Sequence, residues 1–276
     1  MKERFFMFKV KALILMIVLS QVAQSIQVSP AFFTLLDVRL GENYPIKKEL
    51  IIFNESNDSV EYKIDVSGIT LDKVILEGYL PLPSGDFLSV EGEGTFIIPP
   101  RSKLSREMFL SIPCGVSYYN QAWEANVRVS SGNSTFRTAV TTRYFIETPS
   151  SPMRKRHSPS GELAVAPSSI SLSSDSPKAE FRVYNNSGNS LELELFVFVP
   201  ISKDGLTIES TPGWNFRPEL LSAIELDKST ISIEPGKSKK VRIKKTRTTN
   251  IDGEVLIMIS SEFYNRFIRV FVERTP

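Results

Sequence analysis

The residue types that most often carry catalysis or bind metals are scarce in this chain. It has one histidine, His157, and one cysteine, Cys114, far apart in the sequence. A Ser-His-Asp or Cys-His centre needs a base that is held rigidly against its nucleophile, whereas His157 follows Arg156 in a stretch rich in Pro and Ser. A zinc site needs several such ligands at paired spacing. The sequence therefore predicts no nucleophilic centre, no metal site and no cofactor.

The remaining chemical candidates have ordinary structural explanations. Cys114 lies between Pro113 and Gly115 without a neighbouring histidine, which favours a small residue at a strand end over a reactive thiol. Glu91 and Glu93 alternate with glycines but lack the Asp-x-Asp-x-Asp-Gly pattern of a calcium loop. We therefore expect a solvated turn at this place, and a protein that is not an enzyme.

A basic ladder is the first candidate for binding. Lys240, Arg242 and Lys244 alternate within the densest basic run of the chain, so a strand would place them on one face. Such a face is able to meet an anionic glycan, a lipid headgroup or an acidic partner. Lysines on an exposed strand also discourage edge-to-edge aggregation, and the sequence leaves both interpretations open.

Two large aromatic residues form the second candidate. Trp214 and Phe216 lie in Thr211-Pro-Gly-Trp-Asn-Phe216, which the Pro-Gly pair marks as a loop. Exposed aromatic side chains often anchor interfaces, but the same residues are equally suited to closing the open end of a β-sandwich. Both interpretations remain open.

The N-terminus is typical of a secretory signal. Basic residues precede the apolar run 12–19, and Ala23-Gln-Ser25 offers a small-x-small cleavage site. We predict a signal peptide over 1–25; the alternative is a retained N-terminal anchor, for which the strictly apolar run is short. No later segment is long and apolar enough to cross a bilayer, so the mature chain is expected to be periplasmic or extracellular.

The net charge agrees with export and argues against nucleic-acid binding. The whole chain carries +2, but residues 1–25 hold four basic residues and one acidic residue, so the remainder carries −1. The basicity thus belongs to the leader, and no general nucleic-acid footprint remains. A single cysteine excludes an intrachain disulfide, which favours a bacterial type of export over an animal cell-surface protein.

The rest of the chain is predicted to be all β. Trp123, Ala125, Val127 and Val129 alternate with polar residues, as one buried strand face requires. Similar runs separated by Gly, Pro, Asn and Ser predict strands at 32–40, 46–53, 60–66, 104–112 and 136–147. No stretch shows a convincing helical period.

The two halves of the chain repeat each other. The matching pairs are Asn54 and Asn185, Ser56 and Ser187, Ser59 and Ser190, and Glu61 and Glu192, each 131 residues apart. Pro100 and Pro235 also match, because each follows an alternating strand and precedes another. This duplication predicts two tandem domains. We place the first domain at 26–148, a Pro/Ser/basic linker at 149–161 and the second domain at 162–276.

Each half resembles the PapD-like branch of the immunoglobulin-like superfamily. The residues that carry the resemblance are Phe181–Leu193 with its Asn-Ser-Gly-Asn turn, the corner Ile233–Val241, and its first-half version Ile98–Lys103. The resemblance implies two tandem immunoglobulin-like β-sandwiches. It is also similar to the layout of bacterial pilus chaperones, which have a signal peptide, two such domains and no enzyme site.

In that family a chaperone lends an alternating strand to complete a pilin subunit. The resemblance would give this role to the last strand of the first domain, where Phe136, Thr138, Val140 and Thr142 share a face, although this face is poor in bulky aliphatic residues. It also implies a basic residue near the cleft between the domains, for which Arg143 is the candidate. The first strand lacks the arginine that the family places there.

These observations predict an exported, non-enzymatic protein that binds an extracytoplasmic protein partner. The role that we expect is chaperone-like, or that of an assembly component of a cell-envelope or pilus-like structure with a pilin-like or envelope subunit as partner. The alternative is a structural or adhesive surface module that binds glycan or another anionic envelope component. Candidate contacts are Arg143, Trp214, Phe216, Lys240, Arg242 and Lys244.

Overall fold

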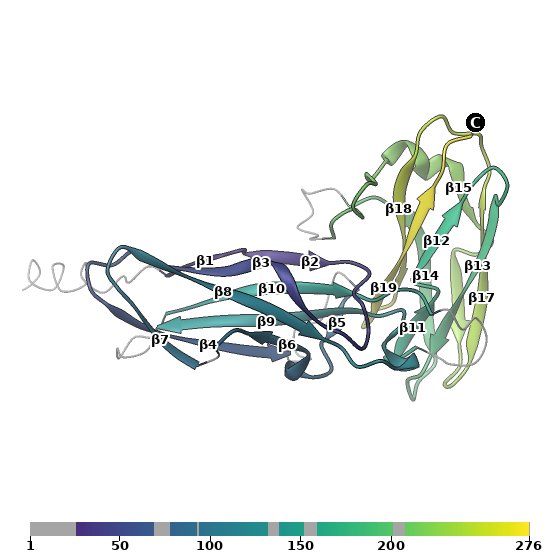
Figure 1. Cartoon of the computed structure of the whole chain (residues 1–276). Coiled ribbons are helices and arrows are strands. Elements are labelled where there is room, and N and C mark those ends of the chain that lie inside the picture. The colour runs from purple at the N-terminus through teal and green to yellow at the C-terminus, as the bar shows by residue number, and fades with distance from the viewer. Residues whose placement is uncertain are drawn as a thin grey trace, which may run out of the picture.

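The computed structural model describes residues 26–68, 78–92, 94–131, 138–151, 159–200 and 208–275. Figure 1 shows two β-sandwiches that meet at an angle; we call their junction the elbow. The expected signal segment 1–25, Phe136 and most of the expected linker lie outside the described residues. Within the described ranges, no helix is both long and apolar enough to span a bilayer.

The first sandwich consists of two sheets. One sheet has the order β1 (Ile26–Ser29), β3 (Asn43–Asn54), β8 (Ser102–Ser111) and β6 (Leu88–Val90). The other has the order β2 (Phe32–Leu35), β10 (Ala139–Glu147), β9 (Ala122–Ser131), β4 (Val60–Gly68) and β7 (Gly94–Ile98), and β5 (Leu80–Pro81) pairs with β9. Two short 3₁₀ helices, η1 (Gly85–Phe87) and η2 (Val116–Tyr118), connect strands.

The second sandwich repeats this topology except for β5, whose place is taken by an isolated bridge between Phe216 and Glu254. Its first sheet has the order β11 (Leu163–Ala166), β13 (Lys178–Asn185), β17 (Ser238–Lys245) and β15 (Ile224–Leu226). Its second sheet has the order β12 (Ser169–Leu172), β19 (Asn265–Val272), β18 (Gly253–Ser260), β14 (Leu191–Phe198) and β16 (Thr230–Ile233), with η4 (Pro218–Ala223) before β15. The predicted fold class, two tandem immunoglobulin-like sandwiches, is confirmed.

The first strand differs from the sequence expectation. Instead of one strand over 32–40, β1 pairs antiparallel with β3 and β2 pairs parallel with β10 in the opposite sheet. Pro30 lies between them and has no N–H to continue a ladder, so the chain changes sheet there. Pro167 lies at the same place between β11 and β12.

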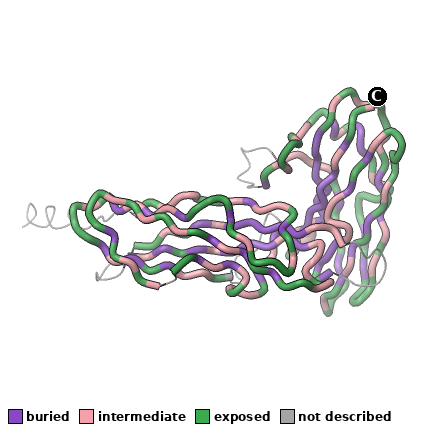
Figure 2. Tube along the Cα trace, viewed as in Figure 1, coloured by how far each residue is buried: buried purple, intermediate pink, exposed green. Residues whose placement is uncertain are grey.

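The cores follow the alternation of the sequence. In β9, the side chains of Trp123, Ala125, Val127 and Val129 are all buried, as predicted. Figure 2 shows buried positions running along both sandwiches and through the elbow. A third apolar cluster joins the sandwiches there and contains Tyr79, Phe145, Ile208, Leu256, Met258 and Phe267. Burying each large side chain contributes about 1.5–3 kcal/mol.

The duplicated corner is built alike in both halves. β16 and β17 belong to different sheets, so the chain crosses the sandwich at Pro235-Gly236, as the sequence predicts. Lys237 N donates to Glu234 O (3.1 Å) and Gly236 has φ 67°, the geometry of a type II turn. Its first-half counterpart carries Arg101 with φ 51° in place of the glycine.

A buried asparagine fastens each corner to the preceding hairpin. Asn185 Nδ2 donates to Ile233 O (2.7 Å) and Asn189 O (2.7 Å), and its Oδ1 accepts from Ser187 N (3.0 Å). The first half has the same bonds from Asn54 at nearly the same distances. The duplicated Asn-x-Ser spacing is therefore explained by a shared structural role.

Candidate partner-binding surfaces

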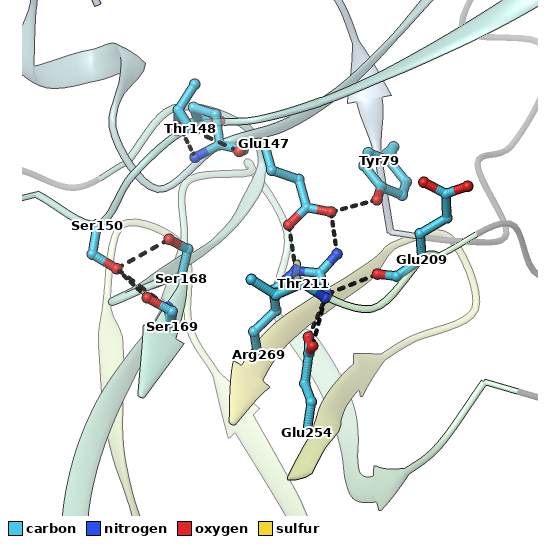
Figure 3. A network of polar contacts seen from close by, with 11 residues as sticks. Tyr79, Glu147, Thr148, Ser150, Ser168, Ser169, Glu209, Thr211, Glu254 and Arg269 are labelled. Carbon is cyan, nitrogen blue, oxygen red and sulfur yellow. Dashed lines mark hydrogen bonds and ion pairs between the residues drawn. The ribbon is translucent and has the colours of Figure 1, made fainter. Parts of the chain in front are cut away.

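A buried charge network holds the elbow together. Arg269 of β19 reaches Glu147 of β10 through Nε to Oε2 (2.6 Å) and Nη2 to Oε1 (2.6 Å), so it joins the two sandwiches. Its Nη1 also contacts Glu254 Oε1 and donates to Glu209 O (3.0 Å). Figure 3 shows the guanidinium enclosed by these oxygens. The Arg269 side chain is only 5% exposed and that of Glu254 0% exposed, so one cation faces two carboxylates with little solvent to screen them.

Two further bonds complete this network. Tyr79 Oη donates to Glu147 Oε1 (2.5 Å), and Thr211 N donates to Glu254 Oε2 (2.7 Å). Burial alone lowers the pKa of Arg269, but the carboxylates of Glu147 and Glu254 outweigh burial and hold that pKa above its ordinary value. The guanidinium is therefore charged throughout the physiological range.

A second arginine bridges the sandwiches without a carboxylate. Arg266 Nε donates to Leu163 O (2.9 Å) and Nη1 donates to Gly78 O (2.9 Å) in the first sandwich. Burial lowers the pKa of Arg266 to about 9, which leaves it charged at neutral pH. Together the two arginines and the apolar cluster fix the angle of the elbow.

Sequence reasoning missed these residues, although a signal was present. Glu254 interrupts the apolar run of β18, and Arg266 and Arg269 interrupt that of β19. A charged side chain in a strand whose neighbours are all apolar must find a partner, because an isolated buried charge is costly. The sequence could not identify the partner of Arg269, because Glu147 lies in the other sandwich.

Arg143 lies beside the elbow on the outer face of β10. Its Nε and Nη2 pair with the two carboxylate oxygens of Glu124 at 2.6 and 3.0 Å, and its guanidinium lies 4.8 Å from the ring centroid of Phe145. The side chain is 39% exposed. Arg143, the candidate for a basic residue near the cleft, thus lies next to the apolar cluster and is held in a bidentate ion pair.

The two aromatic candidates have different surroundings. Phe216 packs against the elbow cluster, whereas the Trp214 ring lies 4.9 Å from that of Phe271. A type II turn places them: Trp214 N donates to Thr211 O (2.8 Å), with Pro212 second and Gly213 at φ 87° third. Of the two interpretations that the sequence left open, a packing role therefore describes Phe216, whereas Trp214 remains partly exposed.

The basic ladder is flanked by carboxylates. Lys240, Arg242 and Lys244 lie on the exposed side of β17. Lys240 pairs with Glu180 (2.8 Å) and Lys244 with Glu225 (3.0 Å), and the hydrogen bond from Lys240 lowers the pKa of Glu180. These acids come from β13 and β15, so the face carries mixed charge. Exposed pairs of this kind contribute little to stability.

An open strand edge lies in β10. Thr138 O accepts from Ser131 N (3.0 Å), so even-numbered residues of this antiparallel pair bond β9 and odd-numbered residues face the other way. Arg143 N donates to Ala31 O (3.1 Å) on that other side, where β2 pairs with 143–146. Among the described strands, none pairs there with Ala139–Thr142. The backbone groups of Ala139 and Thr141 therefore face an open edge.

Comparisons with known proteins return similar structures but no family. No protein-family model and no curated protein matches the chain. Among solved structures, a protein of unknown function from Porphyromonas gingivalis W83 is 14% identical, with 90% of this chain and 99% of that chain covered and a TM-score of 0.37.

Two similar structures are chaperones. The periplasmic chaperone SfaE is 9% identical with a TM-score of 0.33, and the class 5 fimbriae chaperone CfaA is 12% identical with a TM-score of 0.35. In both comparisons 89% of this chain and 99% of the other chain are covered. The chain is similar to these proteins over most of its length.

Proposed function

We propose that the chain is an exported, non-enzymatic binding protein that captures an extended segment of another protein along the open edge of β10. Its role is chaperone-like, or that of an assembly component of the cell envelope. The observation that carries the proposal is the half-strand Ala139–Thr142, which offers backbone donors and acceptors to an incoming strand.

The second sandwich supports this proposal because the same edge is closed there. In β19, the half-strand equivalent to Ala139–Thr142 is Asn265–Ile268, in which Arg266 and Phe267 are buried. Gly78 of the first sandwich packs directly on it, since an added Cβ at Gly78 would lie 3.3 Å from Arg266 Cα. The edge of β19 is thus covered by the first sandwich, whereas the equivalent edge of β10 is left exposed.

Side chains around the open edge favour a polypeptide partner. Phe32 of β2 is 42% exposed and is the register partner of Arg143 on β10. An exposed aromatic beside a half-exposed arginine gives an apolar contact and a charged contact at one end of the edge. Thr141 and Ala139 are small enough to let another backbone approach.

A proline at residue 141 tests this geometry. Thr141→Pro removes an N–H that faces away from β9, so the β9 ladder is retained while strand addition is blocked. The control Thr141→Val retains the N–H. With a photo-cross-linking residue in place of Ala139, cells of the source organism should yield a cross-linked partner whose linked peptide alternates apolar and polar residues.

The expected result is that Thr141→Pro reduces this cross-link at least about tenfold, the effect of about 1.4 kcal/mol, while Thr141→Val retains it. Equal yields from both variants would contradict strand addition. So would an equal yield when the cross-linker replaces Ser232 in β16 of the second sandwich.

A further inference from the structure

The elbow surface of the first sandwich has a counterpart in the second sandwich, near the end of β19 from which the C-terminus follows. At the elbow, Pro81 is the register partner of Glu124 and Leu82 N donates to Glu124 O (2.9 Å). In the second sandwich Phe216 bridges to Glu254, and Arg217 N donates to Glu254 O (3.1 Å). The segments 78–82 and 213–217 are therefore equivalent.

The residues at equivalent positions are the same or closely similar. Gly78 and Gly213 both have φ 87°. The pairs are Gly78 and Gly213, Tyr79 and Trp214, Asn120 and Asn250, Phe145 and Phe271, and Glu147 and Glu273. The aromatic stacking is retained too, because Tyr79 lies 4.7 Å from Phe145 at 51° and Trp214 lies 4.9 Å from Phe271 at 46°.

In the first sandwich all five of these residues contact the second sandwich. Glu147 binds Arg269, Gly78 O accepts from Arg266, and Asn120 Oδ1 accepts from Ser168 N (3.0 Å). The Tyr79 ring lies 5.3 Å from that of Phe267, and Phe145 belongs to the same cluster. The five residues thus form a docking surface whose occupant is a sandwich domain.

In the second sandwich the same surface is exposed. It lies around the end of β19 from which the C-terminus follows (Figure 1). It borders the elbow on one side, because Phe216 packs against the elbow cluster and Phe271 lines the elbow cavity. Glu273 and Asn250 are exposed, and within the described part of the chain no hydrogen bond or ion pair reaches the Glu273 carboxylate. A pocket of about 310 Å³ is lined by Gly213, Trp214 and Asn250 together with the charged residues Arg217, Asp252 and Arg274, whereas the cavity at the filled elbow measures about 50 Å³.

We propose that this surface, the far pole, docks an immunoglobulin-like sandwich domain of another protein. The complementarity seen at the elbow specifies the occupant: an arginine to pair with Glu273, as Arg269 pairs with Glu147, and an aromatic side chain to pack on Trp214, as Phe267 packs on Tyr79. This inference does not depend on the open edge of β10, which lies on the other sandwich.

The first sandwich of a second copy of this chain fits the far pole poorly. It would have to supply the residues that the second sandwich supplies at the elbow. At the positions of Phe267 and Leu256 it carries Thr141 and Asn126. Polar side chains would then face Trp214 and Phe271. The second sandwich of an intact copy already uses Arg269 and Phe267 at its own elbow, so a second copy of residues 26–275 is a poor occupant.

A three-sandwich chain tests the far pole with a probe of known complementarity. A second copy of residues 148–275 is joined directly after Glu273 of the chain 1–273. The added copy then follows Glu273 in the way that residue 148 follows Glu147 in the native chain. The added copy carries Trp214→Phe, so the original Trp214 and the buried Trp123 (1% exposed) are the only tryptophans. Acrylamide quenching of tryptophan fluorescence then reports the exposure of Trp214.

The proposal predicts that the added sandwich protects Trp214 to the level of the buried Trp123. Phe267→Ser in the added copy is the matched control, because Phe267 lies outside the core of its own sandwich; it should restore the quenching seen in the native two-sandwich chain. Glu273→Gln should restore it in part. Quenching in the three-sandwich chain that equals that of the native chain overturns the proposal.

The native occupant is tested by photo-cross-linking from Asn215, an exposed residue that lines the pocket. The cross-linked peptide should belong to a sandwich domain of a different protein and should contain an arginine and an aromatic residue. A cross-link to another copy of this chain contradicts the proposal, as does the absence of any cross-linked protein.

Discussion

Arg143 and Arg269 occupy the same place in two copies of one fold and have different surroundings. Each donates its backbone N–H to the carbonyl at the sheet-switching segment, Ala31 or Ser168, and each pairs with a glutamate on the neighbouring strand, Glu124 or Glu254. Arg269 has acquired a second carboxylate and is buried, whereas the Arg143 side chain is 39% exposed. Both sandwiches therefore contain the same ion pair, and the docking of the sandwiches determines how much that pair contributes to stability.

The largest expected effect follows from removing each arginine in turn. Arg269→Met leaves two buried carboxylates without their cation and should lower the free energy of unfolding by about 3–5 kcal/mol. Arg143→Met should lower it by about 1–2 kcal/mol, because water reaches Glu124 in place of the guanidinium. Urea denaturation measures both, and losses of equal size would contradict the comparison.

The two corners provide a smaller contrast. Gly236 adopts φ 67°, so Gly236→Ala should destabilise the protein by about 1–2 kcal/mol. Arg101 adopts φ 51° with a Cβ, so Arg101→Gly should stabilise it by up to about 1 kcal/mol. Gly188→Ala is the control, because an added Cβ there contacts nothing within 4 Å. Thermal unfolding should place Arg101→Gly highest, the control Gly188→Ala in the middle and Gly236→Ala lowest in melting temperature, and destabilisation by Arg101→Gly would be evidence against backbone strain at Arg101.

The cores give the smallest effect. Tyr144 in the first core takes the place of Val270 in the second, and its buried hydroxyl has no hydrogen-bond partner among the described residues. Tyr144→Phe removes that unsatisfied group and should stabilise the protein by about 1 kcal/mol.

The same variant has a pH signature. Burial raises the pKa of Tyr144 above its ordinary value of 10.0. Above pH 10 the unfolded chain therefore releases a proton that the folded chain retains, and stability falls as pH rises. Tyr144→Phe should make this fall shallower without abolishing it, because burial also raises the pKa of Tyr44 and Tyr62. An unchanged slope between pH 10 and 11 would show that Tyr144 does not contribute.

The sequence was informative wherever a local pattern determined the structure. Alternation in β9 predicted its buried face, and the Asn-x-Ser and Pro-Gly spacings predicted the repeated corner. Contacts between distant segments were not predictable. The partner of Arg269 depends on how the sandwiches dock, and the acids beside Lys240 and Lys244 depend on the register of β13 and β15. Tyr79 follows an irregular stretch, so no period marked it as part of the elbow.

The sheet-switching first strand has a consequence for the order of folding. In each sandwich, the segment after the proline lies parallel to the last strand, so Phe32 pairs with Arg143 and Ser169 with Arg269. Neither sandwich is complete until its final strand has emerged, and such long-range pairing slows folding. The first sandwich therefore completes its sheet only after about 110 further residues of chain have been made. The elbow forms only after β19, near the end of the chain, has paired.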